Sequence, residues 1–349
     1  QPGEEAAVVV RDLHSGEDIY EIPTAAWDSQ LGAQVQWHPT RAEVFFNVMH
    51  EDGLPHAVAI DVKSGNRREL PWTVYMLSPD GRSSISADLR KIGHSQAGYG
   101  VIMVNPDAYR SNARGDNDGV TVMDIDGGSI QTVIPTYHLL ESAGIEIPKT
   151  GSTYVFHVKW SPVTNRIMVV LRWVAPGGQQ RRWVLACDPD GDRVHLLVND
   201  ALWAQGGHHP NWYPDGKRVI MNLRPDVNDQ LRFCEVTDEA EARVIPVTDQ
   251  VGSGHPTIHS SLNWLVSDAY LREQLAPEGC SPLRLINLQT GDERNLANIP
   301  CKPDFAGPRQ EWRVDPHPAW CSDWRHLTFN GWYAGRRAVF MADLGAVLA

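Results

Sequence analysis

The sequence predicts an all-β fold of the β-propeller type with seven blades, or alternatively six. Long amphipathic helical patterns are almost absent. Short β-branched and aromatic runs instead alternate with Gly, Pro, Asp and Asn. One unit also recurs along the chain, which indicates a propeller or a solenoid.

The recurring unit consists of an aromatic or apolar residue, a turn, an apolar strand, a polar turn and a second strand that ends in Asp. Its six copies begin at Gln36–Pro39, Leu77–Gly81, Lys159–Pro162, Asn211–Gly216, Thr257–His259 and Ala319–Asp323. Aromatic residues at these positions pack between blades, so we expect a buried core position for Trp37, Trp160, Trp212 and Trp320.

The two ends of the chain carry complementary halves of the unit. Val8–Glu17 has the end of a unit without its beginning, and the last copy stops after Ala338–Leu344. We therefore expect a single propeller domain over residues 1–349. Its ring would be closed by pairing the strand around Val8–Val10 with the C-terminal blade, which removes exposed sheet edges. Whether the N-terminal piece forms a seventh blade is left open by the sequence.

Composition narrows the choice of partner. The 349 residues include 31 basic and 43 acidic ones, a net charge of -12, which disfavours nucleic acid and anionic membranes as partners. We expect an oligosaccharide or another small-molecule substrate, and a monomer or homodimer. The five cysteines lack the CxxC spacing of a zinc site and suggest reduced thiols. This favours a cytoplasmic location, or a secreted or periplasmic one if a signal peptide was removed before Gln1.

A histidine register runs through the repeat. The residue three places before each aromatic or apolar position is, in turn, Gln34, Val74, His157, His209, His255 and His317. Because the innermost strand of every blade lines the central channel, we expect four imidazoles and one amide to converge there. Three of the histidines precede a proline, which fits the first residue of a strand and hence the channel mouth.

Imidazoles beside an amide oxygen suit a divalent transition metal such as manganese, iron or zinc. We predict His209, His255 and His317 as ligands, completed by His157 or Gln34. A metal-free imidazole cluster for acid–base chemistry and plain structural packing are the alternatives. The other histidines considered lie outside the register and are expected in turns or on the surface: His14, His38, His138 and His326.

Further candidate residues could act on a bound substrate. Arg172 and Arg313 could each bind a carboxylate or, equally, form a structural ion pair. Asp315 could accept a hydrogen bond from a liganding histidine. Tyr99, on a glycine-flanked loop, could reach over the channel or simply pack. Two more cations with the same alternatives are Arg90 and Lys91.

The chain resembles the propeller-fold polysaccharide lyases, the group that contains oligogalacturonate lyase and the ulvan lyases. The resemblance is clearest at Val9–Glu17, Ala26–Trp37 and Tyr75–Gly81. It continues through Gly98–Gly100, Gly254–Pro256 with Ser267–Tyr270, and Arg313–Pro318, whereas the SPDG-type turns are common to all TolB-like propellers. It implies a manganese ion held by histidines and a glutamine, similar to His209, His255, His317 and Gln34 here. Zinc, iron or calcium are the alternative metals.

The resemblance implies a metal-dependent lyase that cleaves a uronic-acid-containing glycan by β-elimination. His157, Arg172, Tyr99 and Arg313 are then the catalytic candidates. The chain departs from these lyases at Leu171, where they carry a histidine. The alternatives are another metal-dependent enzyme acting on a modified sugar or secondary metabolite, and a non-catalytic glycan-binding or scaffold propeller.

Overall fold

The computed structural model describes residues 2–103 and 118–348, which form two compact units. The first unit consists of Gln1–Trp160, Asn165–Arg181 and Cys187–Val194. The second consists of Ser161–Thr164, Arg182–Ala186 and His195–Ala349. Among the described residues, no helix is both long enough and apolar enough to cross a membrane.

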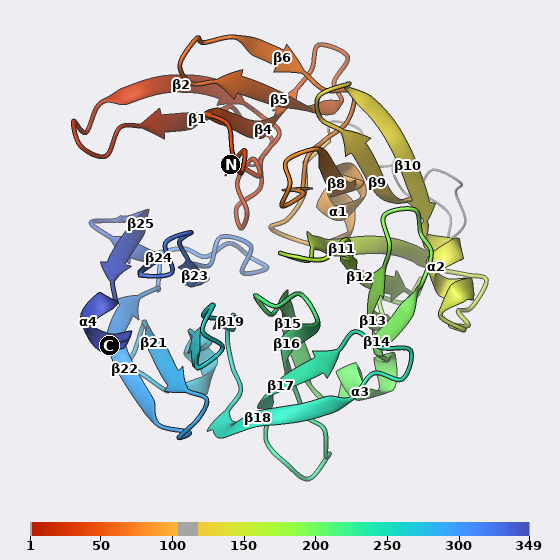
Figure 1. The fold of residues 1–349 in the computed structure, drawn as a ribbon, viewed down its shortest axis with the longest axis vertical. Coiled ribbons are helices and arrows are strands. Elements are labelled where there is room, and N and C mark those ends of the chain that lie inside the picture. The colour runs from red at the N-terminus through yellow and green to blue at the C-terminus, as the bar shows by residue number, and fades with distance from the viewer. Residues whose placement is uncertain (1, 104–117, 349) are drawn as a thin grey trace. The chain divides into compact units, whose positions relative to one another are not determined.

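The N-terminal half of the chain forms a two-stranded sheet followed by two four-stranded sheets (Figure 1). The two-stranded sheet contains β1 (Ala6–Arg11) and β2 (Asp18–Thr24). The next sheet contains β3 (Gln36–Trp37), β4 (Glu43–Met49), β5 (Pro55–Asp61) and β6 (Arg67–Glu69). The third contains β7 (Met76–Leu77), β8 (Ser83–Ala87), β9 (Gly119–Asp124) and β10 (Ser129–Pro135), with α1 (Leu89–Ser95) after β8 and α2 (Thr136–Ser142) after β10.

The rest of the chain forms three four-stranded sheets and one three-stranded sheet. The first contains β11 (Ser152–Trp160), β12 (Ile167–Val174), β13 (Gln180–Cys187) and β14 (His195–Val198), followed by α3 (Asp200–Gln205). The second contains β15 (Gly207–Trp212), β16 (Arg218–Leu223), β17 (Arg232–Thr237) and β18 (Val244–Val251). The third contains β19 (Thr257–Ile258), β20 (Trp264–Ser267), β21 (Cys280–Asn287) and β22 (Glu293–Pro300). The last contains β23 (Ala319–Trp320), β24 (His326–Tyr333) and β25 (Arg336–Asp343), followed by α4 (Gly345–Leu348).

In each larger sheet the strands are neighbours in chain order and antiparallel, as in a propeller blade. Within the described residues the chain therefore forms a β-propeller arrangement of six blades, which confirms the all-β class and the six-blade alternative. The preference for seven blades is not confirmed. The reason is local, because the segment before β3 supplies only the two paired strands β1 and β2, too few for a four-stranded blade.

The terminal strands pair with their sequence neighbours. Strand β1 pairs with β2, with Val8 opposite Ile22 and Val10 opposite Tyr20, and β25 pairs with β24. The expected pairing of Val8–Val10 with the C-terminal blade is not one of these pairings. Closure of the ring, like the single-domain assignment, stays a prediction.

The turn after the aromatic position carries polar side chains that contact the next blade. His38 Nε2 lies 2.9 Å from the carbonyl oxygen of Gly81, in the turn of the following blade. Ser161 Oγ donates to the carbonyl of Gly216 over 3.3 Å, and His259 Nε2 lies 2.7 Å from the carbonyl of Trp324. In these three repeats, one polar side chain of the turn thus links neighbouring blades. His38 is accordingly a turn residue, as expected, but it is buried.

The predicted core tryptophans differ in their burial. Trp160 and Trp212 are buried and Trp320 is half-buried, whereas Trp37 is 58% exposed. The expectation for Trp37 was wrong. The core cluster of this region is built mainly from β1, β4 and β5, and Trp37 is not part of it.

Candidate metal centre

The register positions share an interruption of regular strand pairing. Gln34, Val74, His255 and His317 each lie two residues before the first strand of a blade. His157 and His209 lie inside β11 and β15, where the pairing register shifts. At such places the backbone can turn a side chain out of the ladder.

Three register residues also share an uncommon backbone conformation. Gln34 and His209 both have φ of 57°, and His317 has φ of 47°. Non-glycine residues in this left-handed region cost about 1 to 3 kcal/mol, and such strain concentrates at binding sites. The same local geometry in three blades supports the register that the sequence predicts.

In the second unit, three register histidines lie together. The ring centroids of His209 and His255 are 3.9 Å apart, and those of His255 and His317 are 3.7 Å apart. Donor atoms of His255, His317 and Asp315 all lie within 4.8 Å of one another. Two imidazoles and a carboxylate converging in this way form a donor set that suits a divalent transition metal.

Asp268, which directly follows β20, holds two of these histidines in place. Its Oδ1 accepts from the backbone N–H of His255 over 2.6 Å, and its Oδ2 accepts from the backbone N–H of His317 over 3.2 Å. His255 Nδ1 lies 2.9 Å from both carboxylate oxygens. A carboxylate behind one ring nitrogen of a histidine sets its tautomer, so that Nε2 can act as a metal ligand.

Gly254 allows this close approach. Its φ is +65°, and a Cβ there would lie 2.1 Å from Asp268 Oδ1 and 2.2 Å from the Asp268 carbonyl oxygen. Asn222, fully buried on β16, donates from Nδ2 to the Gly254 carbonyl over 2.9 Å. The Gly254–His255 backbone is therefore fixed from both sides.

Asp315 was expected to accept a hydrogen bond from a liganding histidine, and the structure places it among the candidate ligands themselves. Asp268, and not Asp315, is the carboxylate behind a histidine ring, while Asp315 contributes to the converging donor set. Arg313 Nε donates to Asp315 Oδ2 over 2.7 Å, which is the ion-pair alternative for this arginine. The segment is held by Asn330, whose backbone N–H donates to the Pro316 carbonyl over 2.7 Å.

His209 contacts a tyrosine. Its Nε2 is hydrogen-bonded to the Tyr270 hydroxyl, and the ring centroids of Tyr270 and His255 are 6.0 Å apart. His209 is therefore in the cluster, but its donor atoms are not in the converging set of His255, Asp315 and His317. Its role as a ligand stays a prediction.

Burial governs the electrostatics of the cluster. It raises the pKa of the Asp268 carboxyl, while the charge of His317 and the backbone N–H donors act in the opposite direction. Burial lowers the pKa of His317, although Asp315 and Asp268 oppose this. Burial also lowers the pKa of His208, next to His209, to about 4. These imidazoles are thus kept neutral near pH 7, the form that binds metal.

A cavity of about 1210 Å³ adjoins the cluster. Tyr270, Arg313 and Asp315 line it together with two further cations, Arg272 and Lys302. The large opening therefore meets the converging donor set at Asp315. Its charged lining consists of Arg272, the Lys302–Glu278 ion pair and the Arg313–Asp315 ion pair.

In the first unit, His157 belongs to a second cluster. The Tyr75 hydroxyl lies 2.6 Å from His157 Nδ1, and the ring centroid of Tyr99 is 6.4 Å from that of His157. Burial raises the pKa of Tyr75 well above its usual value, with Asp28 and Tyr99 adding to the effect. Tyr75 therefore stays a neutral hydroxyl that orients the imidazole.

Arg172 lies in the same cluster. Its Nη1 donates to Gln96 Oε1 over 2.7 Å, and its guanidinium carbon is 4.0 Å from the ring centroid of Phe156. Arg172 Nε is buried and has no hydrogen-bond partner among the described residues. Tyr99 itself is buried against Phe156, with ring centroids 4.8 Å apart.

The remaining predicted cations have structural partners. Arg90 forms two 2.8 Å contacts with Asp88, and Lys91 pairs with Asp118 in the interior. Gln34 and His157 belong to the first unit, so their part in the metal shell stays a prediction. Sequence reasoning missed the partners Asp268, Tyr270, Tyr75 and Gln96. For Asp268 there were two signals, its place directly after an apolar strand and its place in Ser267–Tyr270, one of the segments that carry the lyase resemblance.

Comparison with solved structures supports the fold. The β-propeller domain of the Trilobed protease from Pyrococcus furiosus is 10% identical, with a TM-score of 0.54 over 97% of this chain and 84% of that chain. A puromycin-hydrolyzing peptidase from Mycobacterium tuberculosis is 16% identical, with a TM-score of 0.50 over 92% of this chain and 49% of that chain. These similarities show a propeller protein and no particular activity.

An oligogalacturonate lyase in complex with manganese is 14% identical, covering 99% of each chain. Its TM-score of 0.44 is too low to support an argument about the site. No protein-family model matches the chain, and no curated protein matches it in sequence.

Proposed function

We propose that this protein is a metal-dependent lyase that cleaves a uronic-acid-containing oligosaccharide by β-elimination. The observation that carries the proposal is the convergence of His255, His317 and Asp315 beside a cavity lined by Arg272, Lys302 and Arg313. The donor set suits a divalent metal. Lys302 is paired with Glu278 and Arg313 with Asp315, so Arg272 gives the cavity lining its net positive charge, which suits an anionic ligand.

The residues present fit a divalent ion, for which the lyase resemblance favours manganese. His255, His317 and Asp315 would hold it, with His209 as a neighbouring imidazole. When bound, such an ion would stabilise negative charge that develops on a substrate carboxylate. Zinc, iron and calcium are the alternatives, and Gln34 and His157 stay predicted further ligands.

The cavity residues would bind and orient the substrate. Arg313 is held by Asp315 at the edge of the cavity, where its planar guanidinium can face a uronate carboxylate. Arg272 lies farther along the wall and would be the cation that faces a second acidic sugar of an oligomer, since Lys302 is paired there with Glu278. Arg172 is the corresponding candidate in the first unit.

β-Elimination also needs a proton to be removed beside the carboxylate and one to be delivered to the departing oxygen. The proposal assigns proton transfer to His157 or Tyr99. His157 is favoured, because the Tyr75 hydroxyl at 2.6 Å orients its ring. With the Tyr75 oxygen as acceptor from Nδ1–H, Nε2 of the neutral ring carries no proton and would remove the one beside the carboxylate. The resulting imidazolium would then deliver that proton to the departing oxygen.

The test is an assay of oligouronides with and without Mn²⁺, which follows the ultraviolet absorbance of the conjugated double bond that β-elimination creates. We expect product with the wild-type protein and none with His255→Ala. His195→Ala is the matched control, since it removes another histidine paired with a carboxylate, Asp238 at 2.6 Å. Mn²⁺ binding without product from any oligouronide would contradict the lyase and favour a glycan-binding propeller.

A further inference from the structure

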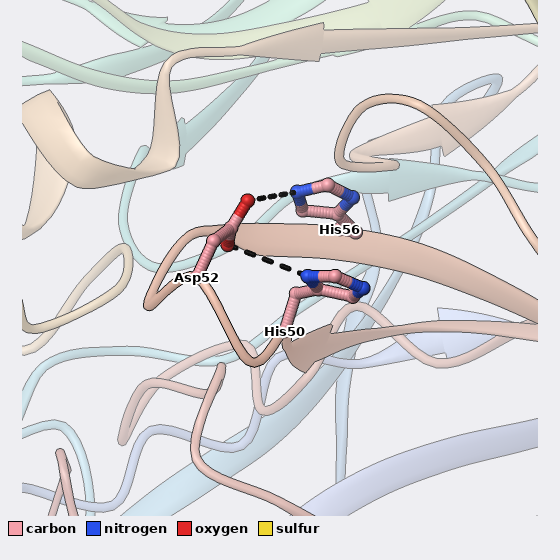
Figure 2. A group of neighbouring side chains, drawn as sticks. All are labelled: His50, Asp52 and His56. Atoms are coloured by element: carbon pink, nitrogen blue, oxygen red, sulfur yellow. Dashed lines mark ion pairs between the residues drawn. The ribbon is translucent and has the colours of Figure 1, made fainter.

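A second group of metal-ligating side chains lies in the first unit, on the hairpin that joins β4 to β5. Figure 2 shows Asp52 reaching toward two imidazoles, those of His50 and His56. The hairpin turn is itself well ordered by hydrogen bonds. The His50 N–H donates to the Leu54 carbonyl, and the Gly53 N–H donates to the His50 carbonyl, both over 2.9 Å.

The turn also fixes the carboxylate. The Leu54 N–H donates to Asp52 Oδ1 over 2.8 Å, which holds the side chain over the turn. His50 Nδ1 is 3.5 Å from Asp52 Oδ1, and His56 Nε2 is 3.9 Å from Asp52 Oδ2. Donor atoms of all three residues lie within 4.8 Å of one another.

Both separations are too long for hydrogen bonds. The 3.5 Å separation already suits a shared ion, and the 3.9 Å separation would have to shorten by a few tenths of an ångström. Hydrogen bonds between nitrogen and oxygen are shorter, at about 2.7 to 3.2 Å. Ligand atoms placed about 2.0 to 2.2 Å from one tetrahedral ion, by contrast, lie roughly 3.3 to 3.6 Å apart. His50 Nδ1 is buried and has no hydrogen-bond partner among the described residues, which a bound cation would explain.

The environment of His50 supports ligation. Its other nitrogen, Nε2, is 3.6 Å from Glu69 Oε2 on β6, the carboxylate position that commonly backs a metal-bound histidine. The two imidazole rings are nearly parallel, with centroids 4.9 Å apart and an interplanar angle of 18°. Because the lone pair of an imidazole nitrogen lies in the plane of its ring, both rings would have to turn toward an ion that they share.

We propose that His50, Asp52 and His56 bind a zinc-class divalent metal ion at a site separate from the histidine cluster of the second unit. Two imidazoles and one carboxylate leave a fourth position of a tetrahedral ion for water or a ligand. A cavity of about 170 Å³, lined by Asp52, His56 and Arg90 among others, adjoins the site. A small anion could reach the ion from there.

A third histidine with carboxylates offers a matched control. His326 lies 2.6 Å from Asp323 and 3.9 Å from Asp343. There, however, the Asp323 oxygen is at hydrogen-bond distance from His326 Nδ1, only one imidazole is present, and the three residues are not a converging donor set among the described residues. We therefore expect no metal binding at His326.

The experiment is equilibrium dialysis of the full chain against Zn²⁺, with bound metal counted by elemental analysis, and a Co²⁺ absorption spectrum as a second readout. His50→Ala/His56→Ala should bind one equivalent less than wild type, and His326→Ala should bind the same as wild type. Asp52→Asn should also lose this equivalent while keeping its fold, since its amide oxygen can still accept from the Leu54 N–H.

The same loss should appear in a His255→Ala/His317→Ala background, which separates this site from the proposed lyase centre. Equal Zn²⁺ stoichiometry in wild type and the folded Asp52→Asn variant would overturn the proposal. So would a loss of equal size in His326→Ala. Failure of lyase activity has no bearing on either outcome.

Discussion

Replacing Asp268 tests how the histidine cluster is held. The carboxylate accepts hydrogen bonds from the backbone N–H groups of His255 and His317 and from His255 Nδ1. Asp268→Ala leaves two backbone donors buried without their acceptor. At about 1 to 3 kcal/mol for each buried unsatisfied donor, the free energy of unfolding should fall by about 2 to 6 kcal/mol.

Asp268→Asn separates stability from metal binding. An amide of the same size keeps one oxygen acceptor, so it should cost less stability than alanine does. Its NH₂ group cannot accept from His255 Nδ1, and it favours the tautomer in which Nε2 carries the proton. Metal affinity should then fall by about 10- to 100-fold, as for other lost carboxylate partners of liganding histidines.

Denaturant unfolding measures the first effect and calorimetric titration with Mn²⁺ measures the second. If Asp268→Asn binds Mn²⁺ as tightly as wild type, Asp268 does not set the His255 tautomer. If Asp268→Ala unfolds at the same denaturant concentration as wild type, the carboxylate does not stabilise the cluster.

Three further predictions follow from single residues. Gly254→Ala should lower the free energy of unfolding by about 2 to 5 kcal/mol, because of its left-handed φ and the clash with Asp268. Gly291→Ala, with φ of +78° and open space around it, should lower it by about 1 to 2 kcal/mol in the same unfolding assay. Equal losses in the two variants would contradict the clash. Burial raises the pKa of the Cys234 thiol from 9.0 to about 12, so the thiol contributes stability below pH 9 that is lost as the pH rises toward 12. Between pH 9 and 11 the free energy of unfolding of wild type should therefore fall by about 2 to 3 kcal/mol more than that of Cys234→Ala. Parallel plots of unfolding free energy against pH for the two proteins would refute this. Arg313→Lys should lower kcat/KM on an oligouronide by about tenfold or more, since lysine cannot reproduce the bidentate contact, and an unchanged kcat/KM would remove Arg313 from the site.

The repeat made most of the fold predictable from the sequence. Each copy of the unit became a blade, because alternating strands and tight turns are local features. The number of blades was harder, since it depended on whether β1 and β2 belong to a blade of their own. The exposure of Trp37 was also unpredictable, because the core beside it is filled by residues of β1, β4 and β5, of which β1 lies outside the repeat copies.

The candidate site was predictable only in part. His209, His255 and His317 could be found because equal positions in successive repeats lie at equal heights. Asp268 could not, because its contact with His317 joins different blades and depends on a backbone approach that Gly254 alone permits. His50 and His56 fall outside the repeat register, and only the folded hairpin brings them to Asp52.

We propose above all that the histidine cluster of the second unit holds a metal ion. An anomalous-difference map from a crystal of the protein soaked in Mn²⁺ tests this most directly. We expect a peak within ligand distance of His255, His317 and Asp315, and no such peak in His255→Ala. Well-ordered side chains at these three residues without a peak between them would contradict it.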